Sequence, residues 1–128
     1  MVRLMSVALR NQSGSVLLVE DDPRVLDALA DLLETKGYAV RKARNGQEAL
    51  AAVKDCHPGL ILLDLSMPVM DGWEFMRQQR LEPGISDVPV IVITALISAV
   101  PAGAKALITK PINVSRLMAL IERHCLPL

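Results

Sequence analysis

Short runs of apolar residues alternate along the chain with segments in which apolar residues recur at helical spacing. Three of the runs are almost continuously apolar, which is typical of strands covered on both faces, and each is followed by a polar side chain. Two shorter, more mixed runs are also strand-like. The predicted strands are residues 15–19, 38–43, 59–63, 88–93 and 105–109.

The segments between these runs carry recognisable helix starts. Asp22 is followed by Pro23, which favours the first helical position, and Gly37 ends the apolar periodicity. Further capping residues are predicted at Asn45, Asp71 and Asn113. Strands that alternate with helices imply parallel strands joined by right-handed crossovers, so the fold class is α/β, with an open sheet between helices.

Composition favours one domain. The chain has 128 residues, of which 52% are hydrophobic and 22% charged, which suits a domain with its own core. We expect residues 1–14 to form a loose N-terminal leader and residues 15–128 to form the single domain. Fourteen basic residues balance fourteen acidic ones, so the chain lacks the positive surplus that binding to a phosphate backbone requires, and no direct nucleic-acid contact is expected.

Neither a signal peptide nor a membrane insertion is predicted. Arg3 and Arg10 interrupt the apolar positions of the leader, and the uncharged stretch 88–104 contains two prolines and is shorter than the ~20 residues a bilayer crossing needs. Cys56 and Cys125 are too few for a disulfide framework, which favours a reducing, cytoplasmic setting.

Candidate chemistry gathers where the strands end. Glu20 and Asp21 follow the first run, Asp64 the third, Thr94 the fourth and Lys110 the fifth. The carboxyl ends of parallel strands meet at one edge, where ligands of open α/β sheets bind. Two carboxylates ~5 Å apart repel by roughly 3 kcal/mol at an effective dielectric constant of about 20, so a compensating cation is expected, and Mg²⁺ suits such oxygen ligands. The set is typical of phosphoryl transfer with an aspartate nucleophile.

Four motifs in this order resemble the receiver domain of bacterial two-component response regulators, over residues 15–125. They read VLLVEDD, LILLDLSMPVMDGWEF, PVIVITA and ITKPI. The resemblance implies a doubly wound five-stranded parallel sheet of flavodoxin-like order 2-1-3-4-5. It also implies a stand-alone phosphoacceptor module, not a turnover enzyme, that receives its phosphoryl group from a histidine kinase or a histidine phosphotransfer protein.

The resemblance also assigns roles to single residues. Asp64 is the implied phosphoacceptor, and Thr94 and Lys110 are the implied contacts of the phosphoryl group. Glu20, Asp21, Asp64 and the backbone carbonyl of Ser66 are the implied Mg²⁺ ligands. A cis peptide bond is implied between Lys110 and Pro111.

The chain departs from the family pattern in two places. Leu107 stands three positions before Lys110, where receivers usually have an aromatic switch residue, and the segment between Thr94 and Lys110 is several residues shorter than usual. We therefore expect a shortened fourth helix of a turn or two. An apolar face over residues 95–107, with Pro101 on the surface, is then expected to bind a second copy or a partner helix, unless the segment folds inward and fills the space beside Leu107.

Other interpretations remain. A phosphatase of the dehalogenase type would carry a second aspartate where this chain has Ser66, and a degenerate receiver would act as a phosphorylation-independent scaffold. The pairs Cys56–His57 and His124–Cys125 lack the spacing of zinc ligands.

Three large apolar residues lie near the predicted site in the sequence. Trp73, Met67 and Met70 are expected to be packing residues there.

Overall fold

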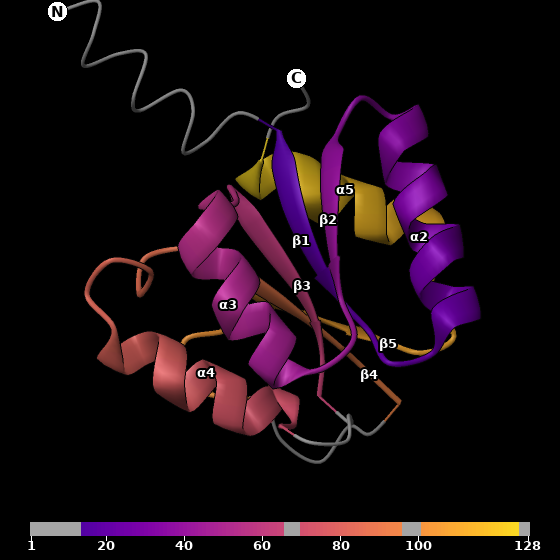
Figure 1. Cartoon of the computed structure of the whole chain (residues 1–128). Coiled ribbons are helices and arrows are strands. Elements are labelled where there is room, and N and C mark those ends of the chain that lie inside the picture. Colours follow the sequence, from indigo (N-terminus) through magenta and orange to yellow (C-terminus); the bar gives the residue numbers. More distant parts are fainter. Residues whose placement is uncertain (1–13, 66–69, 96–100, 126–128) are drawn as a thin grey trace, which may run out of the picture.

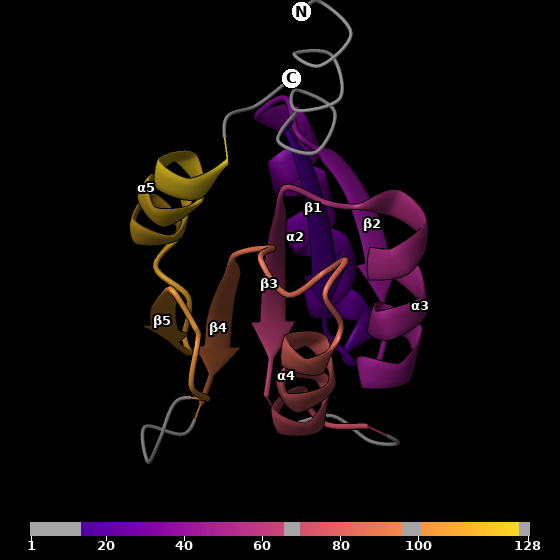
Figure 2. The ribbon, with the colours of Figure 1, turned by 90° about the vertical axis from the view of Figure 1, so that its left-hand side faces the viewer.

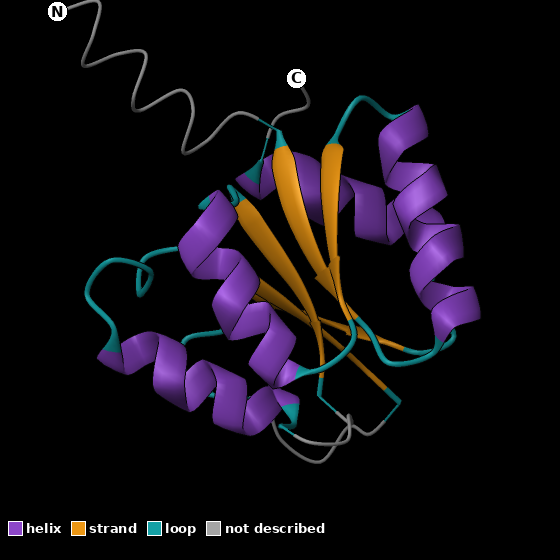
Figure 3. Cartoon of the chain, viewed as in Figure 1, coloured by secondary structure: helices purple, strands orange, loops and turns teal. Residues whose placement is uncertain are grey.

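Five parallel strands form the centre of the molecule, with helices on both faces (Figures 1 and 3). This computed structural model describes residues 14–65, 70–95 and 101–125. The sheet order is β2-β1-β3-β4-β5, which confirms the predicted order 2-1-3-4-5. The strands are β1 (Ser15–Val19), β2 (Ala39–Ala43), β3 (Leu60–Asp64), β4 (Val90–Thr94) and β5 (Ala106–Thr109). The described helices are α2 (Pro23–Thr35), α3 (Gly46–Cys56), α4 (Gly72–Leu81) and α5 (Val114–His124).

The apolar side chains of each central strand divide between two cores. Helices α2 and α5 pack on one face of the sheet, and α3 and α4 pack on the other (Figure 1). Along β1, for example, Val16 and Leu18 belong to the first core and Leu17 and Val19 to the second. Because both faces are covered, the central strands have no polar alternation, as the sequence predicted.

The predicted helix caps are confirmed. The side chains of Asp22, Asn45, Asp71 and Asn113 each accept a hydrogen bond from a backbone N–H in the first turn of their helix. These bonds fix where each helix begins and therefore where each loop at the carboxyl end of the sheet stops.

Four of the five strands differ from the predicted bounds by one or two residues, and two of these differences have local reasons. Strand β3 runs through Asp64, because Asp64 pairs in register with Ile93 of β4. Strand β4 begins at Val90 and not at Val88, because Pro89 has no N–H to donate and the Val88 carbonyl accepts a hydrogen bond from Gln79.

The connection between β4 and β5 is short, and its described part, residues 95 and 101–105, contains a turn but no helix. Residues 96–100, on which the expected short helix and most of the expected apolar face fall, lie outside the described residues. Pro101 is buried, which corrects the expectation that it lies on the surface. Ala95 is exposed, and Leu107 is partly buried against the core of α3 and α4. Figure 2 shows β5 at the edge of the sheet beside β4.

Two further expectations concern α4 and the ends of the chain. Trp73 does not belong to the core: its side chain is exposed, whereas Phe75 and Met76 of the same helix are buried. Met70 is partly buried against the core, and Met67 lies outside the described residues, as do residues 1–13 of the expected leader. None of the described helices combines the length and the apolar content that a membrane crossing needs.

Candidate functional site

Residues from four strands meet at the carboxyl edge of the sheet. Glu20 and Asp21 follow the last residue of β1, Asp64 and Thr94 are the last residues of β3 and β4, and Lys110 follows β5. The strand register brings these ends level, since Asp64 pairs with Ile93, Thr94 pairs with Thr109, and Val19 pairs with Leu63. Chain segments up to ninety residues apart in sequence are thereby placed around one space.

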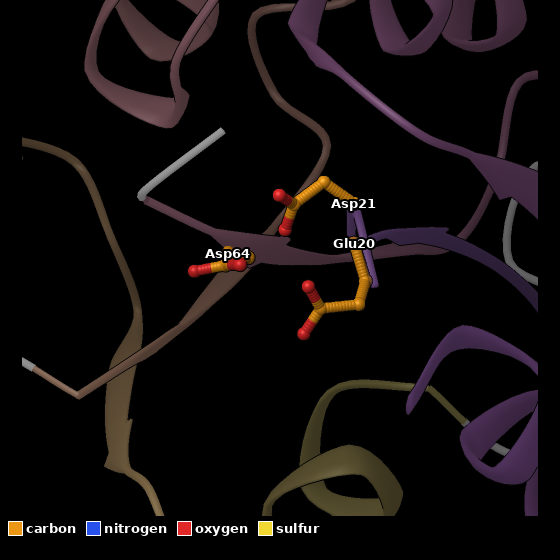
Figure 4. Close-up of side chains that lie close together, drawn as sticks. All are labelled: Glu20, Asp21 and Asp64. Atoms are coloured by element: carbon orange, nitrogen blue, oxygen red, sulfur yellow. The ribbon is translucent and has the colours of Figure 1, made fainter. Parts of the chain in front are cut away.

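Three carboxylates face this space (Figure 4). One oxygen from each of Glu20, Asp21 and Asp64 lies within 4.8 Å of the other two. Glu20 and Asp64 are 3% and 4% exposed, whereas Asp21 is exposed to solvent. Among the described residues this is the one group of three or more His, Cys, Asp and Glu side chains with the geometry to hold a metal ion.

Lys110 supplies a positive charge to the same group. Its Nζ donates a hydrogen bond to Glu20 Oε1 at 2.9 Å and lies 3.5 Å from Asp64 Oδ2. Burial alone would lower the pKa of Lys110, but the hydrogen bond to Glu20 and the charges of Asp64 and Glu20 outweigh it, so the pKa is raised and the ammonium stays charged. The peptide bond to Pro111 is cis, as the resemblance implied.

The backbone holds two of these side chains in place. The N–H of Lys110 donates to the carbonyl of Thr94 at 2.8 Å, which continues the pairing of β4 and β5 beyond the strand. Glu20 donates its own N–H to Ala43 and accepts a hydrogen bond from the N–H of Asp22 through its second carboxylate oxygen. The orientation of Glu20 is therefore fixed by the start of α2 as well as by Lys110.

The charges of the site are unbalanced. Three carboxylates and one ammonium leave a formal charge of minus two if all are ionised. Even at the upper limit of 4.8 Å, two carboxylate oxygens repel by about 3 kcal/mol at an effective dielectric constant of about 20. Desolvation, followed by the hydrogen bond and the charge of Glu20, raises the pKa of Asp21. A divalent cation with a preference for oxygen ligands fits this donor set and this charge.

Of the other residues predicted for the site, the structure describes Thr94 but not Ser66. Thr94 is buried at the end of β4, level with the site, whereas Ser66 lies outside the described residues. Gly72, which the sequence marks only as part of a motif, has no room for a side chain, because a Cβ at this position would lie 2.7 Å from the Asp64 carbonyl oxygen. The Gly72 N–H donates to the Leu65 carbonyl at 3.0 Å. The pair Asp71–Gly72, a helix cap followed by glycine, was the signal that could have suggested this close approach.

The chain is similar in sequence to two known regulators. The polar-differentiation response regulator DivK of Brucella ovis is 33% identical over 116 residues, which are 86% of this chain and 94% of DivK. The DNA-binding dual master transcriptional regulator RpaA of Synechocystis is 33% identical over 84% of this chain, but the chain spans only 47% of RpaA.

A solved structure extends the similarity to three dimensions. The receiver domain of the sensor histidine kinase PA1611 of Pseudomonas aeruginosa, which has a magnesium ion coordinated in its active-site cleft, matches with a TM-score of 0.81. It is 28% identical, and the match covers 88% of this chain and 97% of that domain. The family model of the response regulator receiver domain matches residues 16–122. The chain therefore belongs to the response regulator receiver family of two-component systems.

Proposed function

We propose that this chain is a phosphoacceptor that takes a phosphoryl group on Asp64 and signals through protein contacts, with residues 15–128 acting as one receiver unit. The observation that carries the proposal is the placement of Lys110, which contacts both Glu20 and Asp64 where three carboxylates lie within 4.8 Å of one another. A structural ion pair needs only one carboxylate. Two buried carboxylates and an ammonium at a strand edge instead suit an anion that arrives together with a cation.

The proposed step transfers a phosphoryl group from a nitrogen or oxygen atom of the donor to a carboxylate oxygen of Asp64. A carboxylate oxygen of Asp64 forms a bond to phosphorus while the bond from phosphorus to the donor breaks, and the electron pair of that bond leaves with the donor. The ammonium of Lys110 neutralises charge on the phosphoryl oxygens, and Thr94 donates its hydroxyl proton in a hydrogen bond to one of them. Hydrolysis of the bond between phosphorus and Asp64 later restores the free carboxylate, so the chain is itself modified and then regenerated.

The carboxylates of Glu20, Asp21 and Asp64, with the backbone carbonyl of Ser66, would hold Mg²⁺. When bound, the ion supplies positive charge to the acidic group and to the phosphoryl oxygens. Without it, the formal charge of minus two at the site repels an incoming anion. Modification of Asp64 is therefore expected to require the metal.

The proposal also includes the phosphoryl donor and the surface that passes the signal to other proteins. A histidine kinase or a histidine phosphotransfer protein of the cytoplasm is the expected donor, as for other members of this family. A surface within residues 95–107 that leaves out the buried Pro101 is proposed to contact a second copy or a partner protein, because residues 95–104 of the β4–β5 connection carry no charged side chain. Direct binding to nucleic acid is not proposed, since the formal net charge is zero.

A phosphorylation-independent scaffold is the second candidate. Leu107 favours it, because an aliphatic side chain replaces the aromatic switch residue and is already partly buried against the core of α3 and α4. The two candidates differ in one measurable property, which is whether Asp64 accepts a phosphoryl group.

Intact-protein mass spectrometry after incubation with a small phosphodonor and Mg²⁺ tests this property. We expect the mass of one phosphoryl group to be added to the wild-type chain and to the Asp87→Asn variant, whose aspartate is exposed and precedes the amino-terminal end of β4, opposite the edge that carries the site. The Asp64→Asn variant and a chelated wild-type sample are expected to remain unmodified. Equal modification of the Asp64→Asn variant would overturn the proposal, and an unmodified wild type would favour the scaffold.

A further inference from the structure

The first residue of α3 contacts Met70, which directly precedes the cap of α4. We infer that Gly46 is a positioning residue for the acidic site, which it serves by holding Met70 and, through α4, the backbone of Asp64. This inference rests on the proposed function, because it assigns to Gly46 an effect on metal binding at that site.

A hydrogen bond makes the contact. The N–H of Gly46 donates to the carbonyl of Met70 at 2.8 Å. Gly46 is the first residue of α3, where a backbone N–H has no acceptor within the helix, and the cap Asn45 accepts from Glu48 instead. The donor of Gly46 is thus available for a second segment of the chain, and Met70 uses it.

Only a glycine allows this approach. A Cβ on Gly46 would lie 2.6 Å from the carbonyl oxygen of Met70 and 2.7 Å from its Cγ. The φ angle of Gly46 is not in the left-handed region, so its backbone conformation is open to any residue. The reason for glycine here is therefore the space between α3 and Met70, and the neighbour at 2.6 Å is backbone that cannot rotate away.

The contact reaches the site through described residues. Met70 directly precedes Asp71, the cap of α4, and Gly72 follows. The N–H of Gly72 donates to Leu65 at 3.0 Å, and the space for a Cβ on Gly72 is already taken by the carbonyl of Asp64. A shift of Met70 therefore moves the first turn of α4, which presses against the backbone of Asp64 itself.

The proposed test measures the affinity of the site for Mg²⁺ by isothermal titration calorimetry. Loss of a contact that supports metal ligands typically weakens affinity by 10-fold or more, so the dissociation constant of Gly46→Ala is expected to rise on the order of 10-fold. The Gly84→Ala variant is the matched control, because no atom lies within 4 Å of a Cβ at that position, and its dissociation constant is expected to equal that of the wild type.

A second control separates positioning from general destabilisation. Val53→Ala removes buried atoms from α3 seven residues after Gly46 and leaves the hydrogen bond from Gly46 to Met70 in place, so it is expected to lower the melting temperature while leaving the dissociation constant unchanged. If Gly46→Ala does not fold, Met70→Gly replaces it: this variant keeps the carbonyl but frees the backbone of residue 70, and the dissociation constant is again expected to rise.

The outcomes distinguish this inference from the proposed function. A wild-type chain that binds Mg²⁺, together with a Gly46→Ala variant of equal affinity, overturns the inference alone. An effect of Val53→Ala as large as that of Gly46→Ala also overturns it, because α3 would then act only through stability. A wild-type chain that does not bind Mg²⁺ overturns the proposed function and this role of Gly46 with it.

Discussion

Removal of the ammonium of Lys110 is expected to weaken the fold and to strengthen metal binding at once. Lys110→Met keeps most of the length of the side chain and removes its charge, so the buried carboxylates of Glu20 and Asp64 lose their cationic partner. In the wild type, Lys110 and Mg²⁺ are drawn to the same oxygens. In the variant, the metal has no competitor.

The distances set the size of the first effect. Charges separated by 2.9 Å and 3.5 Å attract by about 6 and about 5 kcal/mol at an effective dielectric constant of about 20, before the desolvation of both partners is subtracted. Loss of one partner of a buried ion pair costs ~3–5 kcal/mol. The Lys110 side chain is 29% exposed, which reduces the effect, so we expect the free energy of unfolding without metal to fall by about 3 kcal/mol.

Binding of Mg²⁺ should restore part of the free energy of unfolding that the variant loses. If the variant binds the metal about tenfold more tightly, saturating Mg²⁺ stabilises it by ~1.4 kcal/mol more than it stabilises the wild type. Denaturant unfolding of both proteins, with Mg²⁺ and with chelator, measures all four free energies.

The control is Lys105→Met, which removes an exposed lysine just before β5 and is expected to change stability by less than ~0.5 kcal/mol with or without metal. Equal destabilisation of Lys110→Met in chelator and in Mg²⁺ would refute the reasoning, because it would mean that the lysine and the metal do not share ligands.

Two further predictions concern groups outside the site. Burial raises the pKa of Tyr38, the single tyrosine, to about 12, and its hydroxyl donates to a backbone carbonyl at the end of α5 at 2.7 Å. The proton is held more tightly in the folded state, so up to about 3 kcal/mol of stability is present below pH ~10 and is lost as the pH rises toward 12. When unfolding is followed across that pH range, Tyr38→Phe should lack this loss of stability. An equal loss in the variant and the wild type would show that Tyr38 is not its source. Gln79 is buried and donates to the carbonyls of Ile85 and Val88, so Gln79→Leu should cost ~2–4 kcal/mol in denaturant unfolding, whereas Gln78→Leu on the outer side should cost less than ~1 kcal/mol. Similar values for the two would show that the α4–β4 turn does not depend on Gln79.

Local signals in the sequence were sufficient for most of the fold. Continuous apolar runs such as residues 15–19 identify strands covered on both faces, and Asp22 followed by Pro23 identifies a helix start, because both signals depend on neighbours in sequence. The strand order could not be predicted from such local signals. It came from the resemblance to a family, since the pairing of β1 with β3 is decided by long-range packing that periodicity does not encode.

The site could be predicted as a set of residues but not as a set of contacts. Parallel strands bring Asp64 and Lys110 to the same edge by topology alone. The pairing of Lys110 with Glu20 at 2.9 Å, closer than its 3.5 Å to Asp64, depends on the rotamers of long side chains and had no sequence signal. The close approach of Gly46 to Met70 was hidden for a similar reason, since an Asn-Gly pair is also typical of an ordinary turn.

Among the described residues, the surface beside the β4–β5 connection is shared with helix α4. Helix α4 buries Gly72, Phe75, Met76 and Gln79, whose spacing of three and four residues defines its inner face. Trp73 is one residue, about 100°, away from Gly72, so the geometry of the helix turns its indole outward, where it is 42% exposed. A groove of about 460 Å³ lies between this helix and the connection, and its lining includes Trp73, Arg80, Pro101 and Ala102. The uncharged run 88–104 predicted an apolar face built from the connection alone. In the described residues, Pro101 instead turns inward, and α4 contributes an indole and charged side chains to the surface that the connection shares with it.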